Sequence, residues 1–147
     1  MSCYDIVRGE VSRDEFLDLE NRYLSAIHRI VAGRPVQAKG LEKWDEEGDL
    51  LRRVGLDDVL TDELPPVDDE AIEGTRLDNI VRRCLRESAW MELGIVGELA
   101  IHFGYDLRLF VVGARDHQWS CVGKEIRSAD RLFVYDSRER ETAMWQL

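Results

Sequence analysis

Apolar and polar positions in the first third of the chain repeat with the period of a helix. Ser12 and Glu15 form the pattern of a capping box, in which each side chain bonds the other residue's backbone N–H. Gly33 and Pro35 are typical of a helix end. The pattern predicts a helix over about 12–32. Between these signals, apolar residues recur every three or four positions: Phe16, Leu17, Tyr23, Leu24, Ile27, Ile30 and Val31.

Two further stretches show helical spacing. Residues 41–54 do so despite Gly48, which weakens a helix by about 1 kcal/mol relative to alanine. Residues 75–103 follow a helix-start signal at Thr75, and Ser88 is a second candidate cap within this range. The range is therefore predicted to be helical, as one bent helix or as two.

After Gly104 the apolar pattern changes to that of extended strands. Residues 107–112 are apolar on both faces, as in a central strand. Further strands are predicted over 118–122 and 131–135, and a fourth over 142–147. Turn residues between these ranges fit an antiparallel meander.

Helices followed by strands predict the α+β class and one domain over residues 1–147. The helices at about 12–32, 41–54 and 75–103 are expected to pack on a C-terminal antiparallel sheet of three to four strands, at about 107–147.

Composition supports a globular protein without a membrane segment. The 147 residues are 44% hydrophobic and 34% charged, and no apolar run of 18 residues is present. The first residues lack the pattern of a signal peptide. Three widely spaced cysteines make a poor disulfide framework. Together these features predict a cytoplasmic protein that binds no membrane.

The net charge of −10 is concentrated in one segment. Residues 42–73 contain 13 acidic and three basic side chains, so the remaining 115 residues are neutral overall. A field of one sign attracts oppositely charged partners and raises association rates. The simpler alternative is that these carboxylates only keep a loop-rich segment solvated.

Candidate catalytic and metal-ligating residues are sparse. The three histidines are far apart, and no Cys-x-x-Cys or His-x-x-x-His spacing exists, so neither a metal nor a cofactor is predicted. Cys121, with His102 or His117 as base, is the only nucleophile considered. Its alternation with Trp119 on an expected strand favours a buried structural thiol. No catalytic residue is therefore assigned.

Direct nucleic-acid binding is disfavoured because an acidic chain repels phosphates. Arg82, Arg83 and Arg86 form the only dense basic cluster. They are expected to form a solvated helix face or to pair with the neighbouring acidic segment.

In size, acidity and absence of catalytic motifs, the chain resembles the class of immunity proteins that bacteria keep against their own toxins. The resemblance implies a binding protein that inhibits a basic protein partner, possibly a toxin or nuclease. The oligomeric state is left open. The predicted contact residues all lie in the acidic segment: Trp44, Asp45, Glu46, Glu47, Asp49, Asp57, Asp58, Asp62, Glu63, Asp68, Asp69 and Glu70.

Three alternatives remain from the sequence. The acidic segment could mimic nucleic acid and block a protein that binds it. The chain could be an enzyme with a dispersed active site around His102, His117 and Cys121. It could also be a regulatory subunit of a larger assembly, which a large exposed apolar patch would favour.

Overall fold

The computed structural model describes residues 1–113 and 116–134. In these residues the chain forms, in order, α1 (Cys3–Val7), α2 (Arg13–Val31), β1 (Gln37–Lys43), α3 (Gly48–Val54), the 3₁₀ turn η1 (Asp57–Val59), α4 (Gly74–Leu85), β2 (Trp90–Ile95), β3 (Leu99–Gly104), β4 (Arg108–Gly113), α5 (Asp116–Glu125) and the π-helical turn η2 (Ile126–Asp130).

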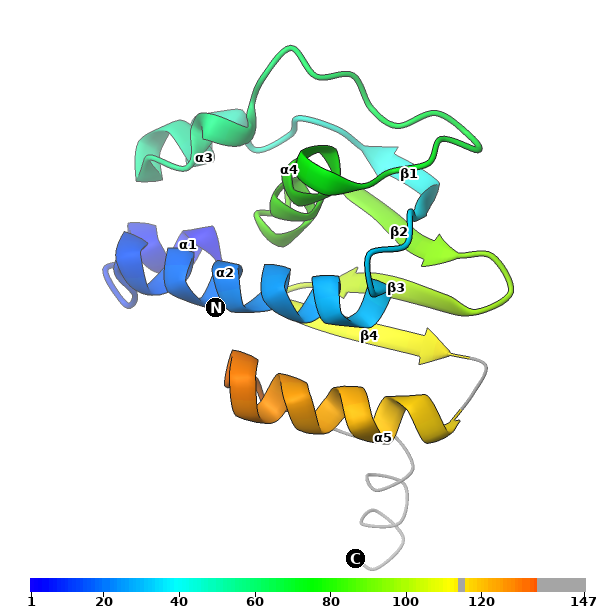
Figure 1. Ribbon diagram of the computed structural model, residues 1–147. Coiled ribbons are helices and arrows are strands. Elements are labelled where there is room, and N and C mark those ends of the chain that lie inside the picture. Colours follow the sequence, from blue (N-terminus) through cyan, green and yellow to red (C-terminus); the bar gives the residue numbers. More distant parts are fainter. Residues whose placement is uncertain (114–115, 135–147) are drawn as a thin grey trace, which may run out of the picture.

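The four strands form one antiparallel sheet in the order β1-β2-β3-β4. Helices α2 and α4 cover the same face of this sheet (Figure 1). The core lies between these layers, where Phe16 and Ile80 of the helices and Leu93 and Ile101 of the strands are buried. The α+β class predicted from the sequence is confirmed.

The predicted first helix is confirmed at both ends. The Ser12 hydroxyl accepts a hydrogen bond from the Glu15 backbone N–H at 3.1 Å, and the Glu15 carboxylate accepts one from the Ser12 N–H at 2.8 Å. Both bonds satisfy backbone donors that the first turn leaves free. The helix ends where Ala32 adopts a left-handed conformation.

The predicted helix over 75–103 is confirmed only in its first half, as α4. Residues 90–104 form the β2–β3 hairpin instead. Buried Met91 and Leu93 alternate with partly exposed neighbours, as they must in a strand with one covered face. The range 41–54 needs a similar correction, because residues 41–43 belong to β1 and the helix begins at Gly48.

The predicted sheet range is right for one strand. The strand at 107–112 is confirmed as β4, but three other strands precede it in the chain. It was expected in the centre of the sheet, and that part was wrong: among the described residues β4 is an edge strand that pairs with β3 alone and has one exposed face. Residues 118–122 lie in α5, and residues 131–134 form no strand, so both predictions were wrong. The strand predicted over 142–147 lies outside the described residues. None of the described helices combines the length and apolar character needed to cross a lipid bilayer.

Candidate protein-binding surface

Arg83 of α4 is completely buried and is surrounded by groups from the acidic segment. Its guanidinium donates hydrogen bonds to Asp45 at 2.9 Å, to Glu63 at 2.6 Å and to the Thr61 hydroxyl at 3.2 Å. It also lies 4.3 Å from the centroid of the Trp44 ring, within the range of a cation–π contact. A single side chain therefore joins two parts of the acidic segment to α4.

Arg86, directly after α4, makes a second buried cluster. It donates two hydrogen bonds to the Glu20 carboxylate of α2, at 2.7 and 2.8 Å, and one to the Leu56 carbonyl at 2.8 Å. Arg86 and Glu20 are 2% and 1% exposed. A fourth bond, of 2.6 Å, reaches Asp58. Partial burial raises the pKa of Asp58. The hydrogen bond from Arg86 and the positive charge of Arg86 lower it by more, so the pKa of Asp58 lies below its usual value.

Arg76, in the first half of α4, fixes the loop that precedes this helix. We call residues 60–73 the acidic loop. Arg76 donates to Glu70 at 2.9 and 3.0 Å, to Glu63 at 2.5 Å and to the Leu64 carbonyl at 3.3 Å. The backbone of Ile72 also exchanges two hydrogen bonds with Val36, at 2.8 and 2.9 Å, which attaches the loop next to β1. The loop is thus held at both its middle and its end.

These contacts decide between the two expectations for the arginine cluster. Arg83 and Arg86 are not a solvated helix face, because both side chains are buried. Both side chains pair with carboxylates of the acidic segment, which was the second of the two expectations. Burying an arginine is costly unless carboxylates and carbonyls satisfy its donors, so these carboxylates serve the fold.

The twelve predicted contact residues therefore divide into two groups. Asp45, Asp58, Glu63 and Glu70 pair with the arginines of α4, Asp49 pairs with Arg52, Glu47 accepts from Tyr4, and Trp44 lies half-buried against Arg83. The remaining five are exposed and make no ion pair within residues 1–113 and 116–134. We call these five the outer carboxylates: Glu46, Asp57, Asp62, Asp68 and Asp69.

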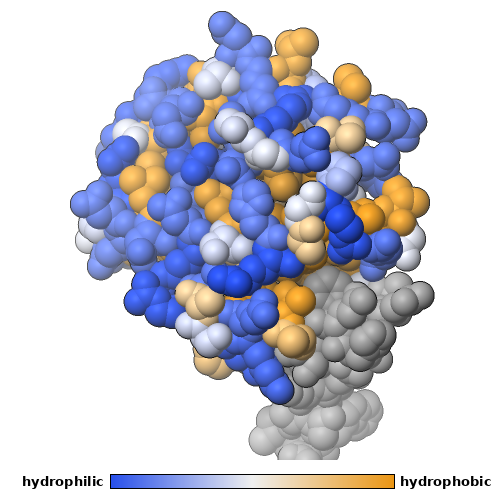
Figure 2. Space-filling model, viewed as in Figure 1, coloured by the Kyte–Doolittle hydropathy of each residue, from blue (hydrophilic) through white to orange (hydrophobic). Residues whose placement is uncertain are grey.

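Two apolar side chains of the acidic loop point into solvent among these carboxylates. Leu64 is 76% exposed and Val67 is 65% exposed. Neither residue is among the twelve contact residues predicted from the sequence. The dipeptide Pro65-Pro66 lies between them and restricts the backbone, which lowers the entropy lost when the loop is bound. Figure 2 shows isolated apolar side chains surrounded by hydrophilic ones on the helix side of the molecule.

The residues of the alternative enzymatic site lie on separate elements. His102 is exposed on β3, where its Nδ1 lies 3.2 Å from the Glu92 carboxylate. Cys121 is exposed on α5, and the side chain of His117 is outside the described part. No hydrogen bond or ion pair joins His102 to Cys121. In the part of the chain that the structure describes, no group of three or more potential ligands is arranged to hold a metal ion.

The three thiols differ sharply in environment, which gives a direct prediction. Burial raises the pKa of both Cys3 and Cys84 to about 12, whereas Cys121 is exposed. Because the thiolate is the reactive form, iodoacetamide should modify one cysteine per native chain, at Cys121. Mass spectrometry should find all three modified after denaturation. Modification of Cys3 or Cys84 as fast as Cys121 in the native protein would contradict the described packing.

Comparison with known proteins adds no identification: no family model, curated protein or solved structure matches this chain.

Proposed function

We propose that this chain is a cytoplasmic binding protein that inhibits a basic protein partner, in the manner of an immunity protein that neutralises a toxin. The acidic loop is the observation that carries the proposal. The loop exposes Leu64 and Val67 to solvent beside the outer carboxylates. Arg76 and Arg83 of α4 hold the loop in place through ion pairs with its Glu63. A fixed loop with apolar anchors in a charged setting has the composition of a protein interface.

The two groups of carboxylates have different roles in this proposal. The inner group, paired with arginines, keeps the loop in one conformation before binding, so less entropy is lost on association. The outer carboxylates are unpaired within the described residues, so their field extends into solvent. Such a field speeds the approach of a basic partner and selects against acidic ones.

The partner that fits is a basic protein with an apolar depression for Leu64 and Val67. Toxins that act on nucleic acid need clustered lysine and arginine side chains to bind phosphates. An acidic loop seated over such a cluster would block access of the nucleic acid. In such a complex the carboxylates of the loop would take the place of the phosphates, so the loop would mimic a nucleic-acid backbone.

The proposal is tested first by capture of the partner. Tagged protein, incubated with lysate of its source at low and high salt, should retain a basic protein at low salt and less of it at high salt. Mass spectrometry then names that protein, and an assay of its activity with and without this chain tests inhibition. Absence of a captured basic protein at low salt contradicts the proposal.

Once the partner is known, charge removal should slow its association. The double variant Asp68→Asn/Asp69→Asn removes two outer carboxylates, and asparagine tolerates the left-handed backbone at Asp69 (φ 63°). Stopped-flow measurements should show an association rate about two- to five-fold lower, with weaker salt dependence.

The matched control is Asp14→Asn/Asp18→Asn on α2, which changes the net charge equally but away from the acidic loop. It also removes the ion pair of Asp18 with Arg22, but that pair lies on the surface of one helix and contributes little to stability. Equal slowing by both variants would indicate a response to net charge alone. The carboxylates Asp45 and Glu47 make poor targets for this test, because they bind Arg83 and Tyr4 within the chain.

A further inference from the structure

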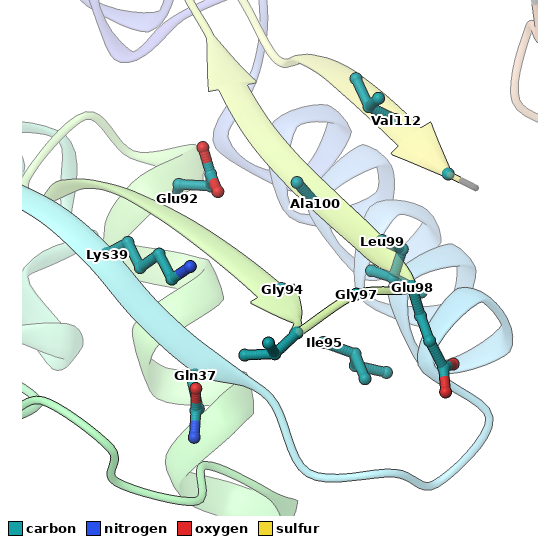
Figure 3. Close-up of a pocket in the computed structure, with 12 residues that line it drawn as sticks. Gln37, Lys39, Glu92, Gly94, Ile95, Gly97, Glu98, Leu99, Ala100 and Val112 are labelled. Carbon is teal, nitrogen blue, oxygen red and sulfur yellow. The ribbon is translucent and has the colours of Figure 1, made fainter.

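The sheet has one face that no described helix covers. Figure 3 views it from this side, with α2 behind the strands and the side chains of Lys39, Glu92 and Val112 in front of them. We call this surface the open sheet face. It is made by the outward residues of β1 to β4 and is separate from the acidic loop.

The strand register arranges this face in two rows. One row runs Lys39, Glu92, His102, Phe110 across the four strands, and the next runs Gln37, Gly94, Ala100, Val112. The two middle positions of the second row are glycine and alanine. They leave a hollow of about 350 Å³ over the two middle strands, at the end of the sheet where the β2–β3 turn lies, with Val112 on one side and Lys39 and Glu92 on the other.

The open sheet face is apolar on the β4 side, where Val112 lines the hollow and Phe110 lies two positions away on the same strand. Phe110 and Val112 are 55% and 61% exposed. The Phe110 ring lies over Gly104, where an added Cβ would come within 2.9 Å of it, so the ring has a defined position. Exposed apolar side chains beside a hollow are typical of a surface that a protein covers.

The charges of the open sheet face differ from those of the chain as a whole. The net charge of −10 makes most approaches between two copies repulsive. This face carries the basic residues Lys39 and Arg108 and the acidic residue Glu92, so positive and negative charges are both present and neither dominates. A strongly basic partner gains little here, whereas a second copy of this chain meets complementary groups.

We propose that the open sheet face binds the same face of a second copy in a two-fold symmetric dimer. A two-fold axis parallel to the strands and between β2 and β3 exchanges β1 with β4 and β2 with β3. It places Glu92 of each copy opposite His102 of the other, within reach of a hydrogen bond, and Lys39 opposite Phe110, a cation–π pair. Gly94 then faces Ala100, which lets the sheets approach closely.

The area of the open sheet face indicates which class of interface the dimer would form. Four strands of about six residues cover about 20 by 20 Å, or roughly 400 Å² per copy. That is about half of a standard interface, the size found in weak and reversible contacts. The inference does not rest on the proposed function, because the acidic loop takes no part in it.

Sedimentation equilibrium on the full chain tests the proposal. The average mass should rise from the monomer's 17.0 kDa toward twice that value as concentration increases from about 1 to 500 μM. A mass that stays at the monomer value over the whole range overturns the dimer.

Two valines provide a matched pair of variants. Val112→Ser and Val67→Ser make the same change at sites of similar exposure, 61% and 65%, but only Val112 lies on the open sheet face. Val112→Ser should weaken dimerisation at least about five-fold, and Val67→Ser should leave it unchanged. If both variants weaken dimerisation equally, or if neither variant weakens it, the association uses another surface and the proposal is overturned.

A second variant blocks the two middle strands of the face. Ala100→Arg fills the hollow and should abolish the dimer, with circular dichroism confirming that the fold is retained. The two proposals fail separately: Val67→Ser should weaken capture of the basic partner but not the dimer, and Val112→Ser should do the reverse.

Discussion

The variant Arg86→Leu should lower the free energy of unfolding by about 3–5 kcal/mol. Among the described residues, Arg86 carries the only charge within 3 Å of the Glu20 carboxylate, and the substitution removes it; Glu20 is 1% exposed. It also leaves the Leu56 carbonyl without its side-chain donor. A buried carboxylate without a partner must remain charged in an apolar setting or take up a proton, and either outcome costs stability.

Urea unfolding measures this loss, and a double variant tests its cause. If the unpaired charge is responsible, Glu20→Leu/Arg86→Leu should recover most of the stability, because both charges are then replaced by apolar groups. Arg82→Leu is the matched control on the same helix: Arg82 is partly exposed and only 3.9 Å from Glu20, so its loss should cost less than about 1 kcal/mol. A double variant as unstable as Arg86→Leu would refute this explanation.

The variant Arg83→Met should cost about 2–4 kcal/mol and loosen the acidic loop. It keeps most of the side-chain volume but removes the donors to Asp45, Glu63 and Thr61. These groups then lose the buried charge that holds them near α4. Amide hydrogen exchange over residues 60–66 should become faster, whereas exchange in α2 should change only with global stability.

Arg53→Met is the control for that experiment. Arg53 is exposed on α3, in the same acidic segment, and makes no ion pair with any described residue. It should change stability by less than about 0.5 kcal/mol and leave exchange in the acidic loop unaltered. Unchanged exchange over 60–66 in Arg83→Met would show that Arg76 alone holds the loop.

The helices whose local signals agree with their tertiary setting could be predicted from the sequence. The capping box at Ser12 and Glu15 and the apolar stripe of α4 are local features, and both helices formed where those features stood. The α+β class followed from helical spacing that is succeeded by an extended apolar run at 107–112. That run was expected in the centre of the sheet, but it forms β4 at the edge of the described sheet, and its outward residues Phe110 and Val112 are exposed.

The hairpin over 90–104 was missed because its apolar residues also fit a helical period. The competing signal was alternation: Glu92 and His102 are outward positions of strands whose inward neighbours are buried. Gly97, with φ of 76°, lies in the turn between the strands, and Gly94 and Gly97, three residues apart, weaken any helix there.

The candidate site was predictable as a segment but not residue by residue. Composition alone located the acidic segment. Which carboxylates are used internally depends on contacts such as Arg83 with Asp45 and Arg86 with Glu20, which join residues 38 and 66 positions apart. The periodic pattern of apolar residues carries no information about which side chains pair across such separations. Leu64 and Val67 could have been found as apolar residues that flank Pro65-Pro66 within a run of carboxylates, a composition typical of a surface loop.

The arrangement of the arginine clusters also has a consequence for synthesis on the ribosome. Each arginine that holds the acidic loop, at positions 76 and 83, follows that loop in the chain, and Arg86 follows η1 in the same way. A nascent chain therefore exposes its most acidic stretch before the neutralising residues are made, and like charges keep that stretch extended. The loop can take its final position only after α4 has left the ribosome.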